Sequence, residues 1–374
     1  MSKLDELLSL PGREDNQYVE EWKDAGGRVI GLVCSYVPEE IIHACGMLPY
    51  RVEARGCTDT CLADVYLHRF NCTYARCLLE MGLAGSYGFL DGFCMLNGCD
   101  QIRRLYDIWT RYVDTDYMYM VTVPHYLYDA GFEWYKEELY YFREHLLDNF
   151  GARCTDDSLR HAADVYNRSR RLIRELYDLR RSEHPPISGC DAMKILLSSY
   201  IMPRDKYNDL LEGALAEIGE RDPISDYKAR IMLGGSACDD HQLIEIIEDL
   251  GAVVVTDSLC YGSKHFLDLV EEDGDPLEEI ARRYYYHNPC PRMMKEYDLR
   301  EQYIEDRARE ADVDGIILEK IVFCDTHGVD NPMLVEELEA KGIPAMNLEI
   351  EYMLSDVGRL KTRIEAFLER IARR

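Results

Sequence analysis

The cysteines are the residues of this sequence best suited to chemistry. The chain carries 14 cysteines and 10 histidines among 374 residues. Two of the cysteines stand in the same local setting, an apolar, strand-like run that leads into Cys-Asp, at Cys99 and Asp100 and again at Cys324 and Asp325. A thiol between a strand and a helix faces the positive end of that helix, which lowers its pKa and favours the thiolate that metals bind. These two positions are therefore predicted metal-binding or redox sites.

The cysteine spacing excludes the common local metal motifs. No C-x-x-C pair of the structural zinc type is present, and neither is a ferredoxin-like run of cysteines. The nearest spacings are those of Cys57 with Cys61, Cys72 with Cys77, and Cys94 with Cys99. A metal group in this protein must therefore be assembled from ligands that are far apart in sequence.

Charge and hydropathy exclude several classes of partner. The formal net charge of -27 opposes binding to a nucleic acid backbone or to an anionic membrane surface. No signal peptide is evident, and no stretch reaches the roughly 18 apolar residues of a membrane span. We expect a cytoplasmic protein with a small-molecule substrate or a protein partner. A reducing compartment also disfavours structural disulfides.

The elements that must position the cysteines alternate between strands and helices. In the first third, strand-like apolar runs cover 28–37, 47–52, 88–99 and 117–124, and helical patterns cover 38–46, 70–85 and the stretch from Asp100 onward. Such alternation predicts βαβ units and a parallel sheet. The strand that contains residues 88–99 is expected to end at Cys99, with the next helix starting at Asp100.

The middle of the chain is almost purely helical, from Phe132 to Arg221, and the alternation then resumes. Later strands are predicted over 229–237, 251–257, 313–324 and 343–350, with helices near 239–250, from Pro276, near 331–342 and over 358–374. The predicted fold is α/β, with an N-terminal α/β lobe at 1–131, a helical section at 132–225 and a C-terminal α/β lobe at 226–374. In open parallel sheets, ligands bind at the carboxyl ends of the strands.

Seven blocks of the sequence, in order, resemble the 2-hydroxyacyl-CoA dehydratase and benzoyl-CoA reductase family. They are "CSYVPEEIIHACGMLPYRV", "RFNCTYARC", "LDGFCMLNGCDQIRRLYDIW", "TDSLCYGSKHF", "HNPCPRMM", "VDGIILEKIVFCDTHG" and "DVGRLKTRIEAFLERI". The resemblance implies two flavodoxin-like (Rossmann-like) parallel-sheet lobes and a 4Fe-4S cluster held by three cysteines. Block by block, these ligands correspond to Cys72, Cys99 and Cys324, and Cys77 is the alternative to Cys72.

The same resemblance implies radical chemistry on an acyl-CoA substrate. The first expectation is an iron-sulfur subunit of an oxygen-sensitive 2-hydroxyacyl-CoA dehydratase. Such a subunit receives a low-potential electron from an ATP-hydrolysing iron-sulfur activator protein and reduces the thioester to a ketyl radical, after which water is eliminated. A subunit of an ATP-dependent benzoyl-CoA reductase, which reduces an aromatic ring, is the close alternative. A homologous second subunit, forming a heterodimer, is also implied.

Two further cysteines fall in family blocks, Cys260 and Cys290. We expect them to be packing residues. As additional ligands, they would make the protein similar to the double-cubane relatives that reduce small unsaturated molecules. A non-catalytic cluster or zinc scaffold subunit is a further alternative. The remaining cysteines are expected to be core or incidental: Cys34, Cys45, Cys57, Cys61, Cys94, Cys154, Cys190 and Cys238.

Other motifs carry little chemistry. The sequence has neither a G-x-x-x-x-G-K-[ST] loop nor a G-x-G-x-x-G fingerprint, so we expect no P-loop ATP site in this chain. His43 and His327 lie near expected strand ends and are candidate acids or bases, although a structural role is the expectation for each.

Overall fold

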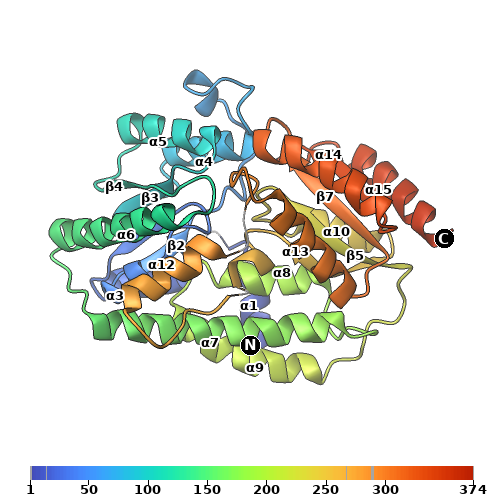
Figure 1. Ribbon diagram of the computed structural model, residues 1–374, viewed down its shortest axis with the longest axis horizontal. Coiled ribbons are helices and arrows are strands. Elements are labelled where there is room, and N and C mark those ends of the chain that lie inside the picture. The colour runs from blue at the N-terminus through green and yellow to red at the C-terminus, as the bar shows by residue number, and fades with distance from the viewer. Residues whose placement is uncertain (1, 14, 267, 288–289, 374) are drawn as a thin grey trace.

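Two four-stranded parallel sheets organise the protein in the computed structural model, which describes residues 2–13, 15–266, 268–287 and 290–373 (Figure 1). The first sheet has the order β2-β1-β3-β4 and the second has the order β6-β5-β7-β8. The α/β prediction is confirmed. The strands are β1 Val29–Leu32, β2 Leu48–Arg51, β3 Gly92–Leu96, β4 Met118–Val121, β5 Ala229–Gly235, β6 Ala252–Ser258, β7 Gly315–Ile321 and β8 Ala345–Ile350.

Both sheets have the strand order of a flavodoxin-like doubly wound sheet, in which the second strand lies outside the first and the third lies on its other side. Helices cover both faces of such sheets, and all seven residues of β5 and of β6 are buried. In each sheet, the chain first adds a strand on one side of the first strand and then continues on the other side. The switch point lies between β1 and β3 in the first sheet and between β5 and β7 in the second. Ligands bind in doubly wound sheets at the carboxyl ends of strands beside such a switch point.

Most predicted helices are present, with shifted boundaries. The helix expected to start at Asp100 is α5, Asp100–Tyr112, but β3 ends at Leu96 and does not reach Cys99. Likewise, β7 ends at Ile321, and α14 (Asp325–Ala340) starts before the predicted stretch near 331–342. The remaining helices around the sheets are α1 Lys3–Ser9, α2 Gln17–Asp24, α3 Glu39–Ala44, α4 Thr73–Leu83, α10 Gln242–Asp249, α11 Ser263–Phe266, α12 Pro276–Tyr286, α13 Tyr297–Glu310 and α15 Val357–Ala372.

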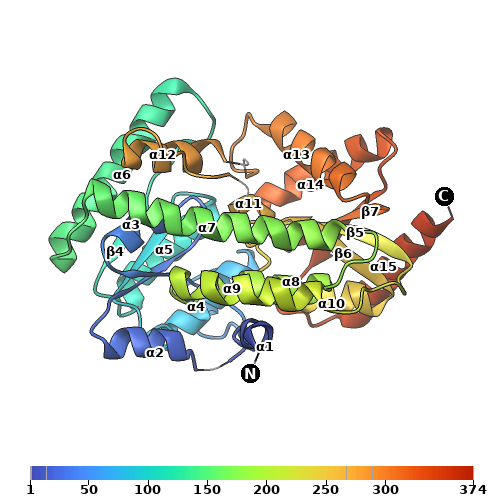
Figure 2. The ribbon, with the colours of Figure 1, turned by 90° about the horizontal axis from the view of Figure 1, so that it is seen from below.

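The predicted helical middle section is confirmed as four helices, α6 Asp129–Phe150, α7 Asp156–Arg181, α8 Gly189–Ser198 and α9 Arg204–Gly219. The long helix α7 runs below both sheets in Figure 1 and across the molecule in Figure 2. It packs against α3 beside the first sheet and against β6 of the second sheet. The middle section therefore fixes the two sheets to one another. Among the described residues, no helix is both long and apolar enough to cross a membrane.

One segment of the C-terminal half packs on the first sheet. Helix α12 follows β6 in the chain, yet Leu277, Ile280 and Tyr284 share a hydrophobic core with Ile30 and Leu32 of β1. The chain returns from this core to the second sheet through residues 290–296, where the Met294 backbone N–H donates to the His125 carbonyl at 2.8 Å. The Met293 carbonyl also accepts from Nη1 of Arg300 in α13 at 2.8 Å, so residues 290–294 are held against both halves of the molecule.

At the carboxyl end of β5, the backbone passes very close to the backbone of β7. Gly235 has φ +135°, and a Cβ atom at this position would lie 2.0 Å from the Glu319 carbonyl oxygen. The next residue, Ser236, donates its hydroxyl to the buried Glu319 carboxylate at 2.9 Å and accepts from the Ile321 backbone N–H at 3.0 Å. Only glycine fits here, because a side chain would collide with backbone that cannot move without breaking the sheet.

We predict that Gly235→Ala destabilises the protein by more than about 3 kcal/mol, because the collision adds to the cost of a positive φ. Gly85→Ala is the matched control, because Gly85 has φ +81° and no atom within 4 Å of the added Cβ. Only the backbone cost of about 1 kcal/mol is expected there. Chemical unfolding followed by circular dichroism measures both changes. Equal destabilisation in the two variants would contradict a close approach of Gly235 to the β7 backbone.

Candidate functional site

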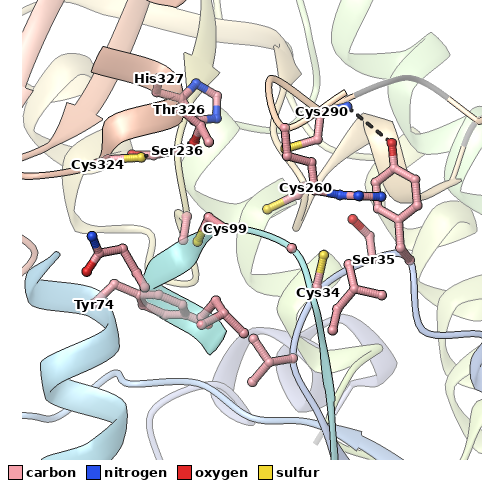
Figure 3. A pocket seen from close by; sticks show the side chains of 18 of the residues that line it. Cys34, Ser35, Tyr74, Cys99, Ser236, Cys260, Cys290, Cys324, Thr326 and His327 are labelled. Atoms are coloured by element: carbon pink, nitrogen blue, oxygen red, sulfur yellow. Dashed lines mark hydrogen bonds between the residues drawn. The ribbon is translucent and has the colours of Figure 1, made fainter. Parts of the chain in front are cut away.

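A pocket lies between the carboxyl ends of the two sheets and encloses about 140 Å³. Figure 3 shows cysteine side chains from both halves of the protein around this space. The pocket is lined by six cysteines, namely Cys34, Cys72, Cys99, Cys260, Cys290 and Cys324. Cys34 follows β1, Cys260 follows β6, and Cys324 follows β7, so the switch points of both sheets contribute.

The three cysteines predicted as ligands occupy equivalent local positions. Cys72, Cys99 and Cys324 are the N-cap residues of α4, α5 and α14. None of them ends a strand, which corrects the expectation for Cys99 and Cys324, because the backbone has to leave the sheet before it can turn into a helix. Phe323 makes that turn before Cys324 with φ +63°. The structure brings all three thiols to one pocket, and their ligation of a cluster stays a prediction.

Gln101 ties these three helix starts together. Its side-chain oxygen accepts from the Cys72 backbone N–H at 3.2 Å. Its side-chain nitrogen donates to the Asp325 carboxylate at 3.3 Å. Gln101 is two residues beyond Cys99, and Asp325 directly follows Cys324. One amide side chain on α5 therefore links the backbone of Cys72 to the start of α14.

The other three cysteines of the pocket are Cys34, Cys260 and Cys290, and the backbone of the last two is held by a cationic and an aromatic side chain. Arg51 donates from Nη1 to the Cys260 carbonyl at 2.8 Å, and its guanidinium lies 3.7 Å from the Tyr261 ring centroid. The Cys290 backbone N–H donates to the Tyr36 hydroxyl at 3.2 Å. Cys34 has φ +88°, a left-handed backbone that non-glycine residues rarely adopt and that is often found at functional sites.

Sequence reasoning missed Cys34, which was expected to be core or incidental. The signal that could have found it is its place directly after β1, because in a 2-1-3-4 sheet the first and third strands are neighbours at the switch point. A residue just beyond β1 therefore lies beside one just beyond β3. Cys260 and Cys290, expected to be packing residues, also line the pocket.

The alternative ligand Cys77 does not line the pocket. It is buried on α4, where its thiol interacts with that of Cys57. Of the two histidine candidates, His43 packs against the rings of His161 and Tyr166 and is also absent from the pocket lining. His327 lines the pocket, and its Nδ1 lies 3.2 Å from the Asn331 side-chain oxygen.

Burial holds most of the pocket thiols in the protonated form. It raises the pKa of Cys99 to about 12 and that of Cys260 to about 11, and it also raises the pKa of Cys34, Cys72 and Cys324. The backbone N–H of Ile102, in the first turn of α5, acts in the opposite direction on Cys99 and is the weaker effect. The expectation that the helix start lowers the thiol pKa is therefore wrong in its net result, because desolvation outweighs the helix terminus.

The charged residues of the pocket are all cations. Arg51, Lys264 and Arg292 are each at least nine-tenths buried, and the described lining includes no aspartate or glutamate. Burial lowers the pKa of His327 to about 3 and lowers that of His287 well below its usual value, so both histidines are neutral. In a protein with a net charge of -27, this pocket is built for a negatively charged group.

The donor set fits an iron-sulfur group better than a single ion. Among the described residues, no three His, Cys, Asp or Glu side chains form a group that could hold one metal ion. In a 4Fe-4S cluster, each cysteine binds a different iron, so its ligands need not meet at one atom. Thiolate ligation also makes such a group anionic, which matches the three buried cations.

The chain is similar to known proteins over most of its length. Residues 34–371 match the family described as 2-hydroxyglutaryl-CoA dehydratase, D-component. The chain is 28% identical to a subunit of benzoyl-CoA reductase from Thauera aromatica, covering 88% of this chain and 87% of that protein. It is 27% identical to the (R)-phenyllactyl-CoA dehydratase beta subunit of Clostridium sporogenes, with 94% of each covered. It is 26% identical to the (R)-2-hydroxyglutaryl-CoA dehydratase beta subunit of Acidaminococcus fermentans, covering 93% and 94%.

We predict that metal loading of this pocket depends steeply on pH. Burial raises the pKa of the three predicted ligands, Cys72, Cys99 and Cys324, and these thiols must lose their protons before they bind iron, so raising the pH from 7 to 9 favours loading. Each thiol that ionises on binding contributes up to about tenfold in affinity per pH unit. Anaerobic reconstitution with ferrous iron and sulfide in weak buffer should release protons, detected with an indicator dye. Loading that is independent of pH would contradict the buried, protonated thiols.

Proposed function

The chain belongs to the 2-hydroxyglutaryl-CoA dehydratase D-component family, a family of 2-hydroxyacyl-CoA dehydratase and benzoyl-CoA reductase type subunits, and we propose that it is the iron-sulfur subunit of a 2-hydroxyacyl-CoA dehydratase. In this proposal, Cys72, Cys99 and Cys324 hold a 4Fe-4S cluster. The observation that carries it is the convergence of three helix N-caps from distant parts of the chain on one cation-lined pocket.

The residues around the thiols suit such a site. When bound, a cluster of this kind would supply single electrons at low potential. Three cysteine ligands would leave one of four iron atoms without a protein ligand, as in catalytic metal sites that keep an open position. Val33, Leu96, Ile102 and Ile321 line the pocket and exclude water, while Gln101 keeps the three helix starts in register.

The proposed partners follow from the family. The dehydratase relatives are named as beta subunits, so this chain is one component of a multi-subunit enzyme. We propose that a homologous second subunit forms a heterodimer with it, that an acyl-CoA is the substrate, and that an ATP-hydrolysing iron-sulfur activator delivers the electron. The reaction is then the one-electron reduction of the thioester to a ketyl radical, followed by loss of water and return of the electron to the protein for later turnovers.

The second trio of thiols favours a second candidate function. Cys34, Cys260 and Cys290 line the same pocket as the first trio. Six thiols would supply three ligands to each of two cubanes, and the protein would then be a double-cubane reductase of small unsaturated molecules. The 28% identity to a benzoyl-CoA reductase subunit favours a third candidate, a ring reductase. Metal content and the reaction catalysed separate the three.

We predict that Cys99→Ser and Cys324→Ser abolish the bound iron and sulfide of the anaerobically purified protein, because each variant removes one of three ligands. Cys190→Ser is the control, since Cys190 is buried on α8 and does not line the pocket. The wild type should hold roughly four irons per chain for one cubane, and Cys34→Ser and Cys260→Ser should keep them. Roughly eight irons, with loss in these variants as well, would establish the double-cubane candidate. An iron-free wild type would contradict both.

Turnover identifies the reaction. With activator, ATP and a set of acyl-CoAs, the proposed dehydratase should release water from a 2-hydroxyacyl-CoA with ATP needed only in catalytic amounts. Ring reduction of an aromatic acyl-CoA with stoichiometric ATP would instead support the ring reductase. No turnover of any acyl-CoA by an iron-loaded protein with its partner subunit would contradict the dehydratase proposal.

A further inference from the structure

Arg292 is a buried cation whose donors are unsatisfied. Its side chain lines the cysteine pocket and is 4% exposed. Its three guanidinium nitrogens, Nε, Nη1 and Nη2, are all buried, and none has a hydrogen-bond partner among the described residues. The guanidinium lies instead on an aromatic face, with its carbon 3.9 Å from the centroid of the Tyr36 ring.

Such an arrangement is costly unless something in the pocket accepts from it. A guanidinium presents five N–H donors, and leaving buried charged donors unpaired costs several kcal/mol. The Tyr36 ring interacts with one face of the guanidinium and leaves the donors in its plane unsatisfied. The other buried arginine of the pocket differs, since Arg51 donates to the Cys260 carbonyl at 2.8 Å.

The surroundings of Arg292 define what it can contact. It is two residues from Cys290, and its positive charge also acts on the Cys34 thiol. No carboxylate lines the pocket in the part of the chain that the structure describes, so a bound ligand can supply the acceptor that Arg292 lacks. The neighbouring thiols point to a sulfur-ligated, anionic group as that acceptor.

Building on the proposed function, we propose that Arg292 is a positioning residue that donates to the iron-sulfur group of this pocket and raises its reduction potential. Reduction adds one negative charge to a group that is already anionic. A fixed cation in a low-dielectric pocket therefore stabilises the reduced form more than the oxidised form. Arg292 would thus ease electron entry into the site without contacting the electron donor.

The test is an anaerobic redox titration followed by EPR, on wild type, Arg292→Gln and Arg292→Lys. Iron and sulfide are measured first in each. In Arg292→Gln we expect unchanged iron content and a roughly tenfold lower ratio of reduced to oxidised cluster at a fixed solution potential, which is about 59 mV for one electron. Arg292→Lys keeps the charge and should give a smaller decrease. Arg103→Gln is the matched control, because Arg103 is exposed on α5 outside the pocket.

Each other outcome has a defined meaning. An iron-loaded Arg292→Gln with the wild-type potential overturns the inference, and weakened acyl-CoA binding in that variant would assign the guanidinium to the substrate instead. If Arg292→Gln folds but holds no iron, the iron content of Arg292→Lys is the deciding measurement. Iron retained in Arg292→Lys supports the inference, and loss of iron from Arg292→Lys as well overturns it. An iron-free wild type refutes the proposed function itself, which is a separate failure.

Discussion

Burying Arg51, Lys264 and Arg292 around one pocket, with no carboxylate in its described lining, is unfavourable unless a negative group offsets their charge. The thiols of the pocket can provide that charge, but only when they ionise, and burial keeps thiols such as Cys99 and Cys260 protonated in the absence of a ligand. An anionic, sulfur-ligated metal group would offset the positive charge of these side chains and would bind the thiols in their ionised form. The remaining structure serves to bring these two sets of side chains together.

The fold achieves this by turning the carboxyl ends of two similar sheets toward one another. Each sheet has a switch point where loops diverge, and each contributes a strand-to-helix loop with a cysteine at the helix N-cap, Cys99 and Cys324. Helix α7 spans both sheets and α12 packs on the first sheet from the second half of the chain. Because α12 packs on the first sheet, the segment that follows it carries Cys290 and Arg292 into the pocket. The chemistry of the pocket therefore depends on packing contacts that lie far from it.

The sequence could predict the repeated local units but not how they meet. Alternating apolar runs were sufficient for the parallel sheets, and the repeated Cys-Asp after a strand-like run indicated Cys99 and Cys324. Cys34 was missed because strand order, which no local pattern contains, makes β1 the neighbour of β3. The place of Arg292 in the pocket could not be predicted from the sequence. It depends on the packing of α12 against the first sheet, which is a tertiary contact. The thiol pKa was misjudged for a similar reason, since the helix start is visible in the sequence while the depth of burial is not.

In the proposed enzyme, thiols that are distant in sequence hold one iron-sulfur group between the two sheets. Anomalous diffraction at the iron absorption edge, from crystals grown without oxygen, tests it most directly. A compact anomalous peak is expected inside the pocket, within bonding distance of the sulfurs of Cys72, Cys99 and Cys324. A pocket free of iron, or iron bound elsewhere on the chain, would contradict it.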